Sequence, residues 1–154
     1  MPETLERIIV DHPFFGNMAS EHIELITECA KNVRFEPGHM IFREGDEAHE
    51  FYCIREGLIA VGFIASHRGF TTIQTVGEGD VLGWSWLVAP YRWHFAAQTR
   101  QTTHALAFDA KCLRAKCEEN HNLGYELLKR FAHIVTDRLD ATRLQLLDLY
   151  GVKN

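Results

Sequence analysis

An aromatic-rich segment, residues 77–99, carries the side chains of this sequence that are best suited to binding chemistry. It contains all three tryptophans, with other aromatic and cationic residues among them: Trp84, Trp86, Tyr91, Arg92, Trp93, His94 and Phe95. An indole N–H needs an acceptor, so three tryptophans in one segment favour a ligand pocket or a partner surface over a dry core. Two interpretations stay open. The rings line a pocket with Arg92 and His94 as its polar tips, or they fill the cavity that a ligand would occupy.

Catalytic and metal-binding residue patterns are missing from the sequence. The nine histidines lack the His-x-His spacing with a downstream glutamate that metal-binding β-barrels use. The chain also lacks a Gly-x-Ser-x-Gly elbow, a Walker loop and a Cys/His pair with an orienting carboxylate. Clustered N-terminal cysteines, which would favour an iron–sulfur sensor, are missing too. The sequence therefore predicts a binding protein and no enzyme.

The composition is that of one ordinary globular domain of 154 residues, with 46% hydrophobic and 24% charged residues. The net charge is −5, and basic residues do not cluster. Because an acidic domain repels phosphate backbones, nonspecific binding to nucleic acid is excluded.

Location and cysteine chemistry follow from what the sequence lacks. The opening residues do not resemble a signal peptide, and no apolar run is long enough to span a bilayer, so we expect a cytoplasmic protein that is not bound to a membrane. The four cysteines have no close metal-ligand spacing, and we expect reduced, buried thiols: Cys29, Cys53, Cys112 and Cys117.

The spacing of hydrophobic residues differs between residues 1–31 and residues 32–109. Residues 1–31 read as a helical lead with a break at His12–Gly16, and apolar residues from Ser20 to Ala30 recur at helical spacing. Residues 32–109 alternate with a period near two between glycine-rich turns, one of which, Glu36-Pro37-Gly38, suits a type II turn. About eight short strands are expected, as in an all-β roll.

Residues 110–154 read as C-terminal helices. Asp109 is a good N-cap for a helix from Ala110 to Cys117. In the following segment, small and apolar residues recur at alternating steps of three and four, as in a heptad seam: Ala132, Val135, Leu139, Thr142, Leu146 and Leu149. We expect a homodimer through this helix; the alternative is that the seam covers the roll of its own chain.

Three blocks with their spacing resemble the glycine framework of the cyclic-nucleotide-binding domain family. They are residues 35–46 (FEPGHMIFREGD), 51–57 (FYCIREG) and 77–83 (GEGDVLG). The resemblance covers nearly the whole chain and implies a single domain over residues 1–154. The implied fold is mainly β: a jelly-roll-like β-roll, or double-stranded β-helix, with N-terminal helices and a long C-terminal dimerisation helix. It is the fold of the sensor half of catabolite-activator and fumarate-nitrate-type regulators. In those proteins a DNA-binding domain follows the long helix, and we expect none here and no direct binding of DNA.

The resemblance also implies where a nucleotide would be held. Ligand-binding members have a Gly-Glu pair for the ribose and, about ten residues later, an arginine for the cyclic phosphate. Here Gly83 matches the glycine, Trp84 replaces the glutamate and Trp93 replaces the arginine. Ser85 could supply a hydroxyl, and Arg92 could replace the lost cation if the loop shifted by one residue. Because both charged anchors are missing, we expect no tight binding of cyclic AMP in the family's usual mode.

The long helix adds two more candidates. Thr142 matches the position from which the family's dimer helix contacts the nucleotide base, and Arg143 follows it; the alternative is that Thr142 is only a small residue in a helix seam. The leading hypothesis is a regulatory domain that senses a small ligand, either a cyclic nucleotide or another anionic or aromatic molecule. Its predicted site residues are Gly83, Trp84, Ser85, Arg92, Trp93, His94, Phe95, Thr142 and Arg143. The alternatives are an interaction module with a filled pocket that binds a partner protein, and the sensor fragment of a longer transcription regulator.

Overall fold

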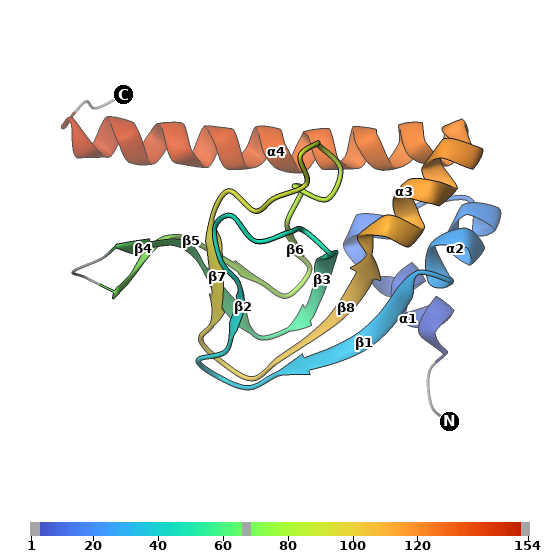
Figure 1. Cartoon of the computed structure of the whole chain (residues 1–154), viewed down its shortest axis with the longest axis horizontal. Helices are drawn as coiled ribbons and strands as arrows, with labels where there is room; N and C mark the ends of the chain where they lie inside the picture. The colour runs from blue at the N-terminus through green and yellow to red at the C-terminus, as the bar shows by residue number, and fades with distance from the viewer. Residues whose placement is uncertain (1–3, 66–68, 152–154) are drawn as a thin grey trace.

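The computed structural model describes residues 4–65 and 69–151. The remaining positions of the predicted domain, 1–3, 66–68 and 152–154, lie outside the described residues. The predicted fold class is confirmed: a two-sheet β-roll is flanked by short helices at the N-terminus and by a long helix at the C-terminus (Figure 1). The helices are α1 (Leu5–Asp11), the 3-10 helix η1 (Pro13–Phe15), α2 (Ser20–Thr27), α3 (Ala110–Glu119) and α4 (His121–Leu149).

The roll consists of two four-stranded antiparallel sheets in the described part of the chain. One sheet has the order β1-β8-β3-β6 and the other β2-β7-β4-β5. The strands are β1 (Ala30–Phe35), β2 (Met40–Phe42), β3 (Glu50–Glu56), β4 (Leu58–Ala65), β5 (Gly69–Gly77), β6 (Val81–Leu82), β7 (Ala96–Thr99) and β8 (Thr103–Asp109). The predicted turn is present: Gly38 has φ of +80°, and His39 N–H donates to the Glu36 carbonyl at 3.3 Å.

Aromatic rings from the roll and from α4 form the centre of the core. Phe51 on β3 stacks on Phe108 of the neighbouring β8 and on Trp86, at centroid distances of 4.8 and 5.0 Å. Phe131 of α4 meets Phe51 edge-on at 5.0 Å. These contacts dock the N-terminal half of α4 on the roll, and its other half runs on past the β4–β5 hairpin (Figure 1).

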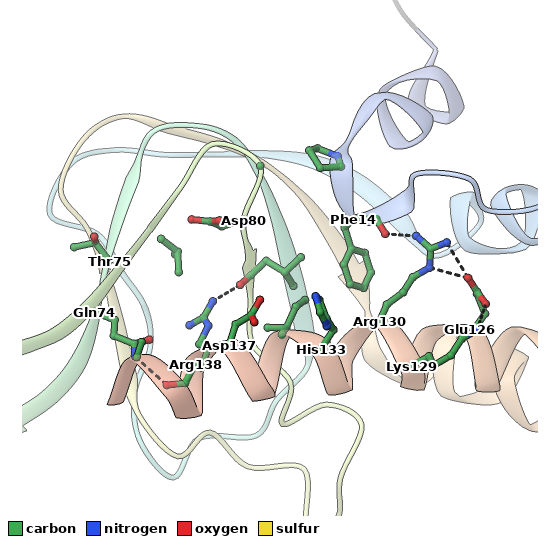
Figure 2. Close-up of a pocket in the computed structure, with 16 residues that line it drawn as sticks. Phe14, Gln74, Thr75, Asp80, Glu126, Lys129, Arg130, His133, Asp137 and Arg138 are labelled. Carbon is green, nitrogen blue, oxygen red and sulfur yellow. Dashed lines mark hydrogen bonds and ion pairs between the residues drawn. The ribbon is translucent and has the colours of Figure 1, made fainter. Parts of the chain in front are cut away.

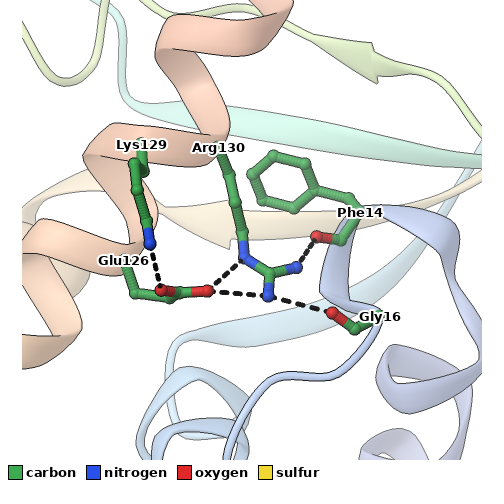
Figure 3. A network of polar contacts seen from close by, with 5 residues as sticks. All are labelled: Phe14, Gly16, Glu126, Lys129 and Arg130. Carbon is green, nitrogen blue, oxygen red and sulfur yellow. Dashed lines mark hydrogen bonds and ion pairs between the residues drawn. The ribbon is translucent and has the colours of Figure 1, made fainter.

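Arg130 fastens the N-terminal lead to α4 (Figure 3). Its guanidinium donates to the backbone carbonyls of Phe14 and Gly16, and Glu126, one turn earlier on α4, accepts from it at 2.8 Å. Lys129 pairs with the other oxygen of Glu126 at 3.5 Å. The fork of the arginine thus holds the backbone of this segment, while the Phe14 ring packs against Phe131 of the same helix at 5.0 Å.

His12 holds the same segment from the other side. Its Nδ1 accepts from Phe14 N–H at 3.1 Å, and its Nε2 lies 3.1 Å from the Ile54 carbonyl of β3, to which it donates in the neutral ring. Burial lowers the pKa of His12, while the Ile54 carbonyl and the charge of Asp80 oppose that shift. His12 is therefore a neutral structural group in the core.

Two expectations about the ends of the roll are wrong. Ala30 does not continue the amphipathic helix, because α2 ends at Thr27 and Ala30 pairs with Phe108 as the first residue of β1. Cys29 and Cys112 are not reduced thiols but form a disulfide; Cys53 and Cys117 are free. The cause is a contact between distant segments: Asp109 N–H donates to the Cys29 carbonyl, which places the two cysteines side by side, 83 residues apart in sequence. Asp109 is also the predicted N-cap, since it accepts from Cys112 N–H at 2.8 Å.

None of the described helices combines the length and the apolar character that crossing a lipid bilayer requires.

Candidate functional site

A cavity of about 300 Å³ lies between the β4–β5 hairpin, the aromatic segment and the middle of α4. Nearly all of its wall is hydrocarbon, contributed by two sheet strands, two aromatic residues and one face of the helix. The lining residues are Val61, Gly62, Phe63, Ile73, Gln74, Trp84, Phe95, Val135, Arg138, Leu139 and Thr142. This apolar cavity is the candidate functional site, and its size is at the lower limit for pockets that bind small molecules.

Three of the sequence-predicted site residues meet in the apolar cavity: Trp84, Phe95 and Thr142. Trp84 is half-buried and lies 5.3 Å from Phe95 between ring centroids, with the two planes tilted by 49°. The two rings thus form one aromatic wall, and Thr142 stands across from them on α4.

The other predicted rings of the segment belong to the core. Trp93 is 3% exposed and stacks on Phe42 at 3.7 Å with an interplanar angle of 6°. Its ring covers Gly83, where φ is +98° and an added Cβ would lie 2.4 Å from the indole. Gly83 therefore leaves room for Trp93 rather than for a ligand. Trp86 and Ser85 are fully buried as well, and the Trp86 Nε1 and Ser85 Oγ atoms have no hydrogen-bond partner in the structure.

Arg92 lies outside the apolar cavity. Its Nη1 donates to the Gly45 carbonyl at 3.0 Å, and Nη2 lies 3.9 Å from the Glu47 carboxylate. Arg92 and Trp93 line a separate hollow of about 480 Å³ on that side of the roll. His94 and Arg143 are exposed, and Arg143 pairs with Asp140 at 3.7 Å. The structure thus separates the predicted polar tips from the aromatic wall.

Sequence reasoning missed Arg138, which is the only charged residue in the described lining of the apolar cavity. Its Nη2 donates to the Val81 carbonyl (Figure 2), and its guanidinium carbon lies 5.6 Å from the centroid of the Trp84 ring. Nη1 is buried and has no hydrogen-bond partner in the described part of the chain. Burial lowers the pKa of Arg138, and the charge of Asp80 partly offsets this. One signal was available: Phe131, Ile134 and Arg138 follow one another at helical spacing, which puts a cation on the buried face of α4.

Gln74 of β5 was missed too. Its side-chain amide donates to Thr142 Oγ1 at 3.3 Å and to the Arg138 carbonyl at 3.4 Å. Gln74, Arg138 and Thr142 therefore gather at one end of the apolar cavity, and they link the β4–β5 hairpin to α4.

A larger groove of about 680 Å³ lies on the far side of Arg138, between η1, the turn before β6 and α4 (Figure 2). Gln74 and Arg138 line both spaces and so form the partition between them. The groove carries charges of both signs, with three carboxylates among its lining residues: Asp80, Glu126 and Asp137. It differs in chemistry from the apolar cavity.

The predicted heptad seam is exposed along α4. Val135, Leu139, Leu146 and Leu149 are 37%, 66%, 51% and 78% exposed. The same spacing continues towards the N-terminus through Leu128, which is 54% exposed. Val135, Leu139 and Thr142 belong both to the seam and to the lining of the apolar cavity. The middle of the seam thus faces the cavity beside the roll of its own chain, and the seam leucines remain largely exposed.

Sequence comparison relates the chain to one domain family and to two longer regulators. The family model described as "Cyclic nucleotide-binding domain" matches residues 32–120. The "CRP-like cAMP-activated global transcriptional regulator" of Mycobacterium tuberculosis is 23% identical over 145 residues, which are 94% of this chain and 63% of that protein. The "Anaerobic regulatory protein" of Bacillus subtilis is 26% identical over 113 residues, 73% of this chain and 48% of that protein. The chain thus spans 63% and 48% of the two relatives' lengths.

A solved structure gives the same result for the fold. A cyclic nucleotide-binding domain from Methylobacillus flagellatus superposes with a TM-score of 0.79 at 18% sequence identity, covering 93% of this chain and 83% of the other. At this identity the likeness shows a shared fold and carries no information about the ligand.

Proposed function

The chain belongs to the cyclic nucleotide-binding domain family, and on that basis we propose that it is a regulatory domain that senses a small apolar or aromatic molecule in the apolar cavity. The proposal rests on one observation, the apolar and aromatic composition of the cavity wall. Trp84, at the position that the resemblance assigns to a ribose-binding glutamate, lies beside Phe95 and presents hydrocarbon to the space. Apolar walls with a few polar groups at one end are typical of ligand pockets.

Cyclic nucleotides fit this wall poorly. A ribose hydroxyl needs a carboxylate, and the described lining of the apolar cavity contains none. The cyclic phosphate needs a cation from the loop, but Arg92 is bonded to Gly45 and paired with Glu47 on the other side of Trp93. We therefore propose that cyclic AMP is not bound in the family's usual mode.

The proposal includes a homodimer formed through the exposed seam of α4, in the cytoplasm. Exposed leucines at heptad spacing favour pairing with a second helix. Because Val135, Leu139 and Thr142 belong to both seam and cavity, a partner helix would lie beside the bound ligand. Ligand binding and dimerisation would then be coupled, since each stabilises the other.

A matched pair of variants tests the ligand site. The fluorescent probe N-phenyl-1-naphthylamine is neutral and apolar, and we expect it to bind the wild-type chain. Thr142→Phe puts a ring into the apolar cavity and should abolish that signal. Asp140→Phe adds the same ring two residues away on another face of α4 and should leave it unchanged. Micromolar binding of cyclic AMP or cyclic GMP in calorimetry, with no binding of the probe, would contradict the proposal.

A second candidate function rests on the same exposed helix face. The seam leucines could bind a partner protein instead of a second copy, which would make the chain an interaction module. A third rests on the two curated relatives, which are regulators longer than this chain; the domain would then be the sensor of a transcription regulator. Light scattering of the purified chain separates the first two, because a dimer at the expected mass supports self-association.

A further inference from the structure

Within the described residues, the guanidinium of Arg138 has no direct ion pair, and the charge of Asp80 acts on it only from beyond ion-pair distance. The guanidinium is nevertheless largely enclosed between α4, β6 and Trp84. Among the described residues, one backbone carbonyl accepts from Nη2, and Nη1 has no acceptor. Burying a cation is unfavourable unless it is paired and fully hydrogen-bonded, so this site has an unmet requirement for an acceptor.

The surroundings of Arg138 decide from which side an acceptor would come. On the side of the larger groove, the negative charge of Asp80 already acts on Arg138 and Asp137 lies in the same lining, so a further anion beside Arg138 would meet these carboxylates. The apolar cavity contains no carboxylate in its described lining, and Arg138 is its only charged residue. In a space of low dielectric, a cation without a direct ion pair favours an anionic partner.

The polar end of the apolar cavity adds neutral donors. The Gln74 amide and the Thr142 hydroxyl both line the cavity, and both donate to the backbone carbonyl of Arg138, the Gln74 amide also to Thr142 Oγ1. A carboxylate offers two acceptor oxygens and can receive more than one of these bonds. The rest of the wall, including Trp84 and Phe95, suits an aromatic or aliphatic body.

We propose that the ligand of the apolar cavity is an apolar molecule with a carboxylate, and that Nη1 of Arg138 turns toward the cavity to bind that carboxylate. Gln74 and Thr142 position the same group. This inference rests on the proposed ligand-sensing function and names its ligand class and anchor. It also places the charge that recognises the ligand on α4 itself.

The test uses two probes of nearly the same shape that differ in charge: indole-3-acetate and indole-3-acetamide. At pH 7.5 the first is an anion and the second is neutral. In calorimetry on the full chain we expect the acetate to bind about tenfold or more tightly than the amide, the usual effect of a charge-assisted hydrogen bond. Arg138→Gln should remove that difference. Arg7→Gln, the same change on α1, should preserve the difference.

Each other outcome overturns a specific part of the proposal. Equal binding of the two probes to the wild-type chain would refute the carboxylate anchor and leave the apolar site standing. A preference for the acetate that survives in Arg138→Gln would assign the anchor to another residue. If neither probe binds, the sensing function itself fails and the inference fails with it. Since the charge preference is measured first on the wild type, the result does not depend on the stability of the variant.

Discussion

The two exposed leucines in the middle of α4 allow a quantitative test of the proposed dimer. Leu139 is 66% exposed and belongs to the heptad seam. Leu144 is 54% exposed on the same helix, but five residues further along it points to a different face. Leu139→Lys should therefore dissociate the dimer, while Leu144→Lys, with the same chemistry and nearly the same exposure, should not.

The expected size of the effect follows from the exposed fraction of Leu139. Complete burial of a leucine side chain contributes about 1.5–3 kcal/mol. With 66% of the residue available for burial, an interface gains about 1–2 kcal/mol from each copy. A two-fold symmetric interface uses the residue twice, so the loss is about 2–4 kcal/mol, or about 30- to 1,000-fold in the dimer dissociation constant.

Sedimentation velocity over a series of concentrations measures this constant for the three proteins, without added ligand because Leu139 also lines the apolar cavity. The reasoning is refuted if the wild-type chain is monomeric at tens of micromolar. It is refuted equally if Leu144→Lys weakens the dimer as much as Leu139→Lys, because the seam would then not be the contact.

Two further predictions concern the disulfide and the buried histidine. Thiol titration of the denatured protein, purified without reductant, should find two thiols rather than four. Cys112→Ala should lower the free energy of unfolding by about 2–5 kcal/mol, because it removes the disulfide. The control Cys117→Ala should change it by less than about 1 kcal/mol. Four thiols would contradict the Cys29–Cys112 bond. The pKa of His12 is lowered in the folded chain, so the unfolded chain binds more protons and stability should fall as the pH drops below about 6.5. His12→Asn keeps an acceptor for Phe14 N–H and should flatten urea-denaturation midpoints between pH 7.5 and 5; an unchanged slope would assign the effect to another group.

The features that the sequence predicted are those with local causes. The turn at Gly38, the helix cap at Asp109 and the period-two strands depend on neighbouring residues, and all three are present. The Cys29–Cys112 bond and the start of β1 at Ala30 depend on the pairing of β1 with β8, a contact across most of the chain. Local patterns contain no information about such contacts.

In the aromatic segment, too, the sequence could not predict which side chains point into the core. In the irregular stretch between β6 and β7, no period determines which rings point inward. Once Trp93 packs on Phe42 and over Gly83, the alternation of an extended chain turns the adjacent Arg92 outward, where it forms an isolated bridge with Glu47. The resemblance to ligand-binding relatives gave the positions of the lost anchors. It also named the two tryptophans at these positions, but only the structure shows that Trp84 lies in the cavity wall and Trp93 in the core.

Arg138 supplies a positive charge near the cavity, where Trp93 has replaced the loop arginine of ligand-binding relatives. With Trp93 in place of the loop arginine, the positive charge near the cavity comes from α4 instead of from the aromatic segment. A ligand anchored there would bind directly to the helix that carries the dimer seam, one residue from Leu139. Its binding free energy would then favour the position of α4 in which Arg138 reaches the cavity, and that position also determines how the seam faces its partner. By this reasoning, Trp84 and Trp93 remove the usual nucleotide contacts, and the ligand is instead anchored on α4, the helix through which we propose that the chain dimerises.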